Sequence, residues 1–304
     1  MTIHLANAPV SYGVFEMTVG SERFLAPAER VLDEVAAAGY AGIDLGPLGY
    51  LGEGDALGER LAGRSLALSG AYIELPFHDP SALDEAMPAL ERTLDVLDLA
   101  AGGGNPPPPP TLAAAGSPEH RARPGQAEHD PTIGLDEAGW AELARGLQRV
   151  VDRCRSRGHE PAFHHHAATY VEASREVDRL LGMTDVSLCL DTGHLLVGGG
   201  DPVAALERWA GRIRHVHLKD ADMGLLGQIV DEGASADEIW SRGVFRPLGH
   251  GALDVATFLR GLQAMGYDGW IVVEQDVLTG AAARFEQAVA DQRANLELLR
   301  GLVS

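Results

Sequence analysis

The sequence has few cysteines, few basic side chains and no long apolar run. Its two cysteines, Cys154 and Cys189, form no disulfide framework, and both lie in apolar segments typical of reduced, buried thiols. The 24 Lys and Arg residues face 44 Asp and Glu residues, which gives a formal net charge of −20 and disfavours a nucleic-acid partner. No apolar run approaches the ~18 residues of a membrane span, and the N-terminus lacks the pattern of a signal peptide. We therefore expect a cytoplasmic protein with no membrane partner.

Short apolar runs alternate with amphipathic stretches along the chain, whose hydrophobic content of 45% suffices for a large core. The predicted strands are Ile3–Ala8, Gly42–Leu45, Leu66–Ile73, Thr111–Ala115, Pro161–His164, Ser187–Asp191, Ile213–Lys219 and Trp270–Glu274. The predicted helices are Ala28–Ala38, Ser81–Ala101, Asp136–Arg157, Val171–Leu181, Pro202–Ala210, Asp254–Met265 and Ala281–Leu302. Strands that alternate with helices favour a parallel sheet, and the length suits one α/β barrel spanning residues 1–304.

Two connections are unusually long for such a barrel. The first, near residues 102–135, contains the five prolines Pro106–Pro110, which disfavour a central strand before Thr111 because proline cannot donate to a sheet ladder. The second, near residues 221–251, contains a short predicted helix near Ala236–Trp240. Loops that follow barrel strands lie over the active-site face, so we expect both connections there.

Polar motifs stand at the ends of the predicted strands in the second half. Asp191-Thr192-Gly193-His194 follows a buried run, and its carboxylate and imidazole are ligands that a divalent ion accepts. The alternative is a turn in which Asp191 is only a cap. In Arg214–Asp220, alternation places His215, His217 and Lys219 on one face, where a metal or substrate oxygens would satisfy them.

These side chains differ in depth and in the alternatives open to them. His215 lies deeper and is more typical of a structural residue, whereas Lys219 suits either a carboxylate partner or substrate oxygens. Glu274 directly follows a buried run, which makes it a ligand, a base or half of an ion pair. Beside Asp191 and His217, we favour the ligand.

Three consecutive histidines follow the apolar segment Pro161–Phe163. His164 and His166 share one face of the strand and His165 points the opposite way, so one or two of them are expected to face the cavity. Weaker signals come from the first half. Polar residues that follow its predicted strands suit either a substrate pocket or ordinary loops: Asn7, Glu16, Asp44, Glu74 and His78.

At these residues the chain resembles the xylose isomerase-like TIM barrels, the sugar phosphate isomerase/epimerase superfamily that includes AP endonuclease family 2. Among its members it is most similar to inosose dehydratases. The segments that carry the resemblance are Ala8–Gly13, Gly46–Tyr50, Phe163–Thr169 and Gly266–Asp276. The resemblance implies a (β/α)8 barrel over nearly the whole chain, and a homodimer or homotetramer.

The resemblance also implies one divalent ion, usually Mn, with Co, Zn, Fe or Mg as alternatives. Asp191, His217 and Glu274 match three ligand positions of the family, and His164 matches the position at which epimerases carry Glu. That departure puts a symmetric exchange between two carboxylates in doubt and leaves a dehydration open.

We also predict catalytic and substrate-binding roles for individual residues. Glu274 or a nearby histidine removes a proton next to a metal-bound carbonyl, and His194 or His166 delivers one to the departing oxygen. The predicted substrate-binding residues are Lys219, Asp220, Glu16, Glu74 and His165.

The predicted function is therefore that of a metal-dependent lyase or isomerase of a cyclitol or keto-sugar, within inositol and carbohydrate metabolism. The alternatives are a ketose 3-epimerase of the same fold and a non-catalytic sugar-binding or assembly subunit. A DNA-repair endonuclease is disfavoured by the charge of −20.

Overall fold

A parallel sheet forms the centre of the molecule. The structure is a computed structural model that describes residues 2–21, 24–100, 106–278 and 282–303. Its nine-stranded sheet has the order β3-β2-β1-β11-β8-β7-β6-β5-β4. The strands are β1 Ile3–Asn7, β2 Gly42–Ile43, β3 Ala67–Leu68, β4 Ala71–Leu75, β5 Pro110–Ala114, β6 Ala162–His164, β7 Ser187–Asp191, β8 Ile213–Leu218 and β11 Gly269–Val273.

The two ends of this order meet, because β3 and β4 are consecutive segments of one strand. Only Ser69 and Gly70 separate them, and Leu45 N donates to Gly70 O across to β2. The sheet therefore closes on itself with eight strand positions, as the predicted (β/α)8 barrel requires. The prediction of one unbroken strand over Leu66–Ile73 was wrong at Ser69 and Gly70. A Cβ on Gly70 would lie 2.7 Å from Asp44 Oδ2, so a close approach inside the barrel requires glycine there.

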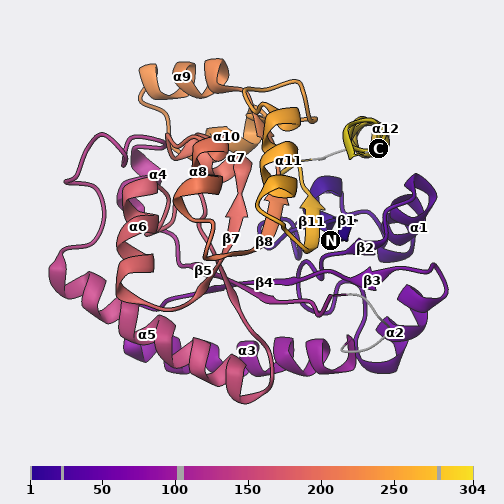
Figure 1. Cartoon of the computed structure of the whole chain (residues 1–304), viewed down its shortest axis with the longest axis horizontal. Helices are drawn as coiled ribbons and strands as arrows, with labels where there is room; N and C mark the ends of the chain where they lie inside the picture. The colour runs from indigo at the N-terminus through magenta and orange to yellow at the C-terminus, as the bar shows by residue number, and fades with distance from the viewer. Residues whose placement is uncertain (1, 22–23, 101–105, 279–281, 304) are drawn as a thin grey trace.

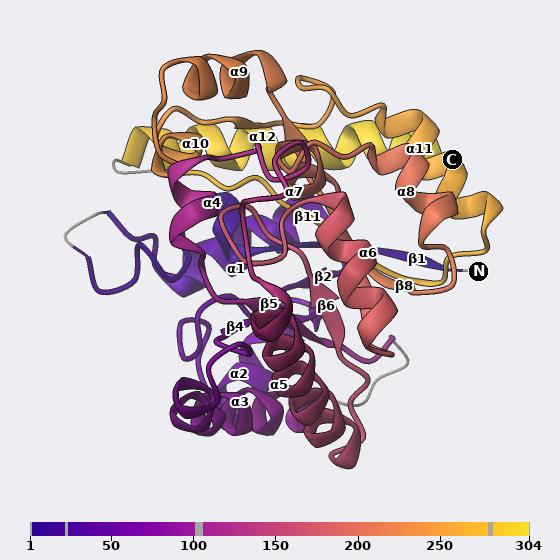
Figure 2. The same cartoon turned by 90° about the vertical axis from the view of Figure 1, so that its left-hand side faces the viewer.

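Helices surround the barrel on its outside (Figures 1 and 2). The main ones are α1 Ala28–Ala38, α2 Gly54–Ala62, α3 Pro80–Ala100, α5 Glu137–Ser156, α6 Ser174–Met183, α8 Pro202–Arg208, α11 Val255–Ala264 and α12 Ala282–Val303. In both views α3 and α5 lie side by side on the side of the sheet away from α9 and α12. None of the helices in the described ranges is long and apolar enough to cross a membrane.

Short helices and one short pair of strands lie in the loops that follow the barrel strands. They are η1 Pro9–Tyr12, α4 Pro118–Ala122, α7 Thr192–Val197, α9 Met223–Asp231, α10 Asp237–Ser241 and the antiparallel pair β9 Asp220–Ala221 and β10 Phe245–Arg246. We did not predict α2, α4, α7 or α9. Of these, α4 and α7 have only five and six residues, too few to show a clear helical period.

Local chemistry explains how the helices begin and end. The first helix is confirmed at Ala28–Ala38, and Gly39 ends it with φ of 98°, a left-handed conformation that favours glycine. Ser81 is not the N-cap of α3. The Asp79 carboxylate accepts from Ser81 N at 3.0 Å and Ala82 N at 3.1 Å, which places the cap two residues earlier. The predicted glycine end of that helix lies outside the described residues.

The proline run enters the barrel without breaking it. The strand begins at Pro110, one residue before the prediction, and the carbonyl of Pro109 accepts from Ala71 N at 3.1 Å, a contact that needs no proline N–H. The carbonyl of Pro106 accepts from Trp270 Nε1 at 3.0 Å. Trp270 is buried inside the barrel beside Ala6 and Val272, and its ring centre lies 5.1 Å from that of His4, so side chains fill this end of the barrel.

Candidate metal centre and substrate cavity

Four adjacent strands bring the predicted ligands together at their carboxyl ends. His164 ends β6, Asp191 ends β7, His217 lies in β8 and Glu274 follows β11, and β6, β7, β8 and β11 are neighbours in the sheet. The register pairs Asp191 with His217, so these two side chains lie at one level of the barrel. Parallel strands point their carboxyl ends to one face, which is why residues far apart in the sequence converge here.

Asp191 lies at the centre of the cluster. Its Oδ2 atom is 3.3 Å from His164 Nε2 and 3.7 Å from His217 Nδ1. Its Oδ1 atom accepts from His194 N at 2.8 Å, so Asp191 also caps α7. Glu274 Oε2 lies 3.3 Å from His217 Nδ1. Asp191 therefore caps α7 through Oδ1, whereas Oδ2 faces the two histidines and is not used by the cap.

Lys219 lies among the same carboxylates and is the only lysine in the sequence. Its side chain is buried, and Nζ lies 3.3 Å from Asp191 Oδ2, 3.0 Å from Glu274 Oε2 and 2.6 Å from Asp276 Oδ1. Nζ is also 3.0 Å from His194 Nε2. A buried ammonium group surrounded by three carboxylates is a permanent positive charge inside the site.

The motif Asp191–His194 makes room for this lysine. A Cβ on Gly193 would lie 2.5 to 2.8 Å from the stem carbons of Lys219, so only glycine allows the stem to pass. The Thr192 hydroxyl donates to Lys219 O at 2.6 Å and accepts from Lys219 N at 2.8 Å. Nζ also lies 5.1 Å from the centre of the Phe245 ring, within the range of a cation–π contact.

These charges shift one another's pKa values. Burial alone would raise the pKa of Asp191, but Lys219 and His194 hold it well below its usual range. Burial would likewise raise the pKa of Glu274, but His217 and Lys219 lower it. The pKa of Lys219 is raised, because the Asp191 carboxylate and its neighbours outweigh the effect of burial. Two carboxylates and one ammonium group are therefore ionised together.

The residues present fit a divalent ion. One oxygen or nitrogen atom from each of Asp191, His217 and Glu274 lies within 4.8 Å of the others, and all three residues are buried. Nδ1 of His164 and both ring nitrogens of His217 are buried without a hydrogen bond of normal geometry. Buried polar atoms without partners are rare in proteins, and a cation of the Mn, Co, Fe or Zn class would satisfy this mixture of nitrogen and oxygen ligands.

Another side of the site is formed by four residues that line the cavity: His166, His194, Asp276 and Trp240. The rings of His166 and His194 lie 3.8 Å apart between centres, and His166 is stacked on Trp240 at 6.2 Å. Trp240 Nε1 donates to Asp276 Oδ2 at 3.1 Å, which ties α10 to the end of β11. Burial lowers the pKa of both histidines, so both imidazoles are neutral at neutral pH.

The site opens into a cavity of about 400 Å³, within the range of small-molecule pockets. Glu16 and Glu74, both predicted to bind substrate, line it together with Asp44 and Tyr72 from the first half of the barrel. Burial raises the pKa of Glu16 above its ordinary value and that of Asp44 to about 6. Carboxyl groups opposite the Lys219 side suit the hydroxyl groups of a polyol.

Two predicted substrate-binding residues do not reach this cavity. The Asp220 carboxylate accepts from the backbone N–H groups of Gly249, Gly251 and Leu253 at 2.8 to 2.9 Å, so it shapes the loop that follows β10. His165 is buried on the far side of its strand, and its Nε2 accepts from Asp191 N at 3.3 Å. Both residues position the site and do not line it.

The sequence analysis did not include Tyr72 or Trp240 among the site residues, and both line the cavity. Tyr72 shares the inner face of β4 with Glu74, and strand alternation from Glu74 could have found it. Trp240 lies on a five-residue helix within a long connection, where no sequence pattern indicates a direction.

Comparison with known proteins agrees with this geometry. A family profile described as Xylose isomerase-like TIM barrel matches residues 32–300. The chain belongs to this family. The chain is similar to an inosose dehydratase of Lacticaseibacillus casei, with 31% identity over 293 residues that cover 95% of each chain. A rhizopine catabolism protein, MocC, of Rhizobium meliloti is 33% identical over 253 residues, which cover 82% of this chain and 75% of that protein.

Among solved structures, D-allulose 3-epimerase of Methylomonas sp. is similar in fold. Its TM-score is 0.67 at 15% identity, and the match covers 99% of this chain and 97% of that chain. The family resemblance and the barrel predicted from the sequence are thereby confirmed.

Proposed function

We propose that this protein is a divalent-metal-dependent lyase that dehydrates a cyclitol or keto-sugar of the inosose class. The observation that carries the proposal is the convergence of His164, Asp191, His217 and Glu274 on a cavity of about 400 Å³, with three ring nitrogens that form no hydrogen bond of normal geometry. The similarity to inosose dehydratases over 95% of the chain supports the substrate class. We also propose that residues 1–304 act as one barrel domain, with the connections near 102–135 and 221–251 over the site.

His164, Asp191, His217 and Glu274 would hold the ion. When bound, a divalent cation supplies a Lewis acid that polarises a carbonyl and stabilises the negative charge formed when a neighbouring proton leaves. The Lys219 ammonium group adds a second fixed positive charge. Its Nζ lies 3.0 Å from Glu274 Oε2. The chain itself thus provides electrostatic stabilisation on the same side of the cavity.

Dehydration removes a proton from the carbon next to the carbonyl and a hydroxyl group from the following carbon, and the two leave as water. Glu274 is shared between His217 and Lys219, which suits a ligand better than a free base. His166 and His194 border the cavity as a close pair, and this supports the proposal that they carry the proton from carbon to the departing oxygen. Asp276, within 2.6 Å of Lys219 Nζ and 3.7 Å of His194 Nε2, orients both groups.

The ketose 3-epimerase alternative needs two carboxylates on opposite sides of one carbon. The strand position that would supply one of them carries His164, whose Nε2 faces Asp191 at 3.3 Å. The lyase is therefore favoured over the epimerase. The assembly-subunit alternative leaves the buried nitrogens without partners unexplained.

A metal-reconstituted substrate screen tests the proposal. The full-length protein is stripped with a chelator, reloaded with Mn²⁺, Co²⁺ or Zn²⁺, and incubated with inososes and with free ketoses, with products followed by ultraviolet absorption and NMR. We expect an ion-dependent dehydration product from an inosose. An epimerised ketose would favour the ketose 3-epimerase alternative, and no turnover with any ion would favour a binding role.

A further inference from the structure

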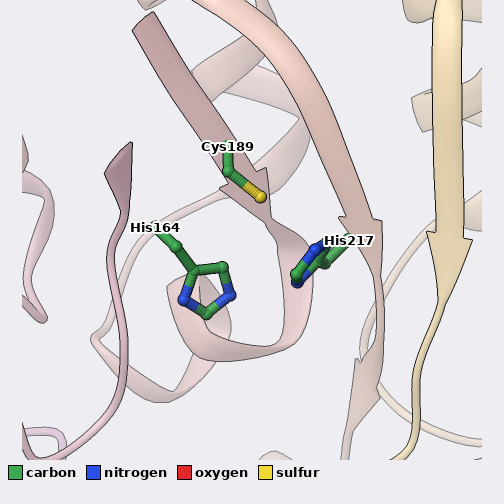
Figure 3. A group of neighbouring side chains, drawn as sticks. All are labelled: His164, Cys189 and His217. Carbon is green, nitrogen blue, oxygen red and sulfur yellow. The ribbon is translucent and has the colours of Figure 1, made fainter. Parts of the chain in front are cut away.

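A second set of metal-ligating side chains lies beside the carboxylate cluster. Figure 3 shows His164, Cys189 and His217 on the adjacent strands β6, β7 and β8, with the sulfur of Cys189 directed towards the space between the two imidazole rings. The register pairs His164 with Cys189, so the thiol lies one inward-facing residue below Asp191 on its strand. One ligand atom from each of the three residues lies within 4.8 Å of the others.

The three side chains are almost completely buried. The exposed fractions of His164, Cys189 and His217 are 2%, 0% and 1%. The ring centres of His164 and His217 are 4.7 Å apart. Nδ1 of His164 and the ring nitrogens of His217 are buried without a hydrogen bond of normal geometry. A tetrahedral ion with bonds of ~2.0–2.3 Å holds its ligand atoms roughly 3.5 Å apart, so side-chain movements of about 1 Å would close this set on one ion.

We propose that His164, Cys189 and His217 form a distinct site for a thiol-seeking transition-metal ion such as Zn²⁺, Cd²⁺ or Co²⁺. The ligand chemistry separates it from the carboxylate position: thiolate sulfur with two imidazoles selects soft or borderline ions, whereas carboxylate oxygen suits Mn²⁺ and Mg²⁺. As the sulfur–metal bond forms, the thiol proton passes to the solvent.

The two positions exclude each other because they share both imidazoles. An ion held at Cys189 takes His164 and His217 away from Asp191 and Glu274, where the proposed function requires them. The inference thus deepens the proposed function, since it predicts that sulfur-preferring ions inhibit the enzyme from within its own site. Binding at Cys189 does not itself need turnover, so it is tested separately.

Titration of the metal-free, full-length protein with Co²⁺ tests the site. We expect a thiolate-to-cobalt charge-transfer band in the near ultraviolet that saturates at one equivalent. The sequence contains one other cysteine, Cys154, which is buried on α5 and serves as the matched control. The band should persist in Cys154→Ser and disappear in Cys189→Ser.

Folding of the variants is checked by circular dichroism, and Cys189→Ala provides a second variant if Cys189→Ser fails to fold. If neither Cys189 variant folds, persistence of the band in Cys154→Ser assigns it to Cys189, because no third cysteine exists. Bound Co²⁺ without the band in the wild-type protein would overturn the proposal, as would an undiminished band in a folded Cys189 variant.

Inhibition provides the link to activity. Cd²⁺ added to the Mn²⁺-loaded enzyme should inhibit the wild type and Cys154→Ser equally, and Cys189→Ser roughly 10- to 100-fold more weakly, as for loss of a residue that supports a metal. Equal inhibition of all three would overturn the link. If no substrate is turned over, the proposed function fails, whereas the cobalt band still decides the site.

Discussion

Two buried clusters contain histidine and carboxylate side chains, and they differ in whether all of their polar atoms form hydrogen bonds. The metal cluster, defined as His164, Asp191, His217, Lys219 and Glu274, leaves ring nitrogens without hydrogen bonds. The α6 cluster, defined as His120, Glu172 and Glu176, lies at the start of α6 and shows no such atom among the described residues.

Every polar group of the α6 cluster has a protein partner. His120 lies 2.7 Å from Ser117 Oγ and 3.0 Å from Glu176 Oε1. Glu176 Oε2 accepts from Glu172 N at 2.9 Å and from Ala173 N at 3.0 Å. Glu172 accepts from Ala168 N at 2.6 Å and Gly125 N at 3.2 Å, so it joins the loops around the cavity.

This difference distinguishes a structural hydrogen-bond network from a site suited to bind a ligand. A fully satisfied buried network holds loops in one arrangement, whereas buried polar atoms without partners carry a free-energy penalty that a ligand would remove. Both clusters contain histidine and carboxylate side chains, so the presence of these groups alone does not distinguish them.

The largest expected effect is in the metal cluster, on exchange of its central carboxylate. Asp191→Asn should lose the bound ion and lower kcat/KM by about 10⁴-fold, roughly 5 kcal/mol of transition-state stabilisation. Elemental analysis and steady-state kinetics of the Mn²⁺-loaded protein measure both. Asp231→Asn, at an exposed aspartate on α9, is the control and should leave both unchanged. Retention of ion and rate in Asp191→Asn would remove Asp191 from the site.

Replacing the ammonium group tests whether charge balance stabilises the metal cluster. Lys219→Met leaves buried carboxylates without their cation and should lower the free energy of unfolding of the metal-free protein by about 3 kcal/mol, measured by urea denaturation. Added Mn²⁺ should then stabilise the variant more than the wild type, because the ion restores positive charge. An unchanged unfolding midpoint would show that Lys219 does not balance these carboxylates.

The α6 cluster should respond in stability and not in metal content. His120→Ala removes the imidazole partner of Glu176 Oε1 and Ser117 Oγ and should lower the free energy of unfolding by about 2 kcal/mol, measured by urea denaturation. The ion content by elemental analysis should equal that of the wild type. A loss of metal in this variant would contradict the separation of the two clusters.

The smallest expected effect is a pH dependence within the α6 cluster. Burial raises the pKa of Glu172 to about 7 from an ordinary value of 4.5, and His120 and Glu176 are the titratable groups that face it. Because the folded state binds this proton more tightly, its stabilising contribution is complete below pH 4.5 and is lost as the pH rises through 7. Glu172→Gln has no such proton, so its unfolding free energy should fall between pH 6 and pH 7 by about 1 kcal/mol less than that of the wild type.

Urea denaturation at both pH values measures this difference. Glu207→Gln, at an exposed glutamate of α8, is the matched control and should keep the wild-type dependence. Identical pH dependence in Glu172→Gln and the wild type would show that Glu172 does not bind a proton over this range.

The prediction of the fold succeeded where hydrophobic period and end signals coincide. Ala28–Ala38 and Ser187–Asp191 have the predicted bounds, because an apolar run and a defined terminus occur together in each. The prediction failed for α9, which we did not propose. That nine-residue helix has buried Leu226 and Ile229, and its place depends on packing beside α7 and α10, which no local pattern indicates.

Within the site, the predictions for the histidine triplet were likewise partly right and partly wrong. Strand alternation predicted that His164 and His166 share a face, and both line the cavity. His165 was also predicted to bind substrate, but the same alternation turns it towards the backbone of Asp191. The period of the strand was the better guide to direction, because neighbouring side chains on a strand must face opposite sides.

The sequence alone determined the barrel and the strand ends that carry His164, Asp191, His217 and Glu274, because each follows or ends a short apolar run and parallel strands share one carboxyl-end face. Only the tertiary structure decided that Lys219 lies among three carboxylates, that Asp220 holds a loop, and that Cys189 faces the two imidazoles. Those relations depend on the register between strands and on the paths of the loops. Contacts between distant segments set both, and the local order of residues does not contain them.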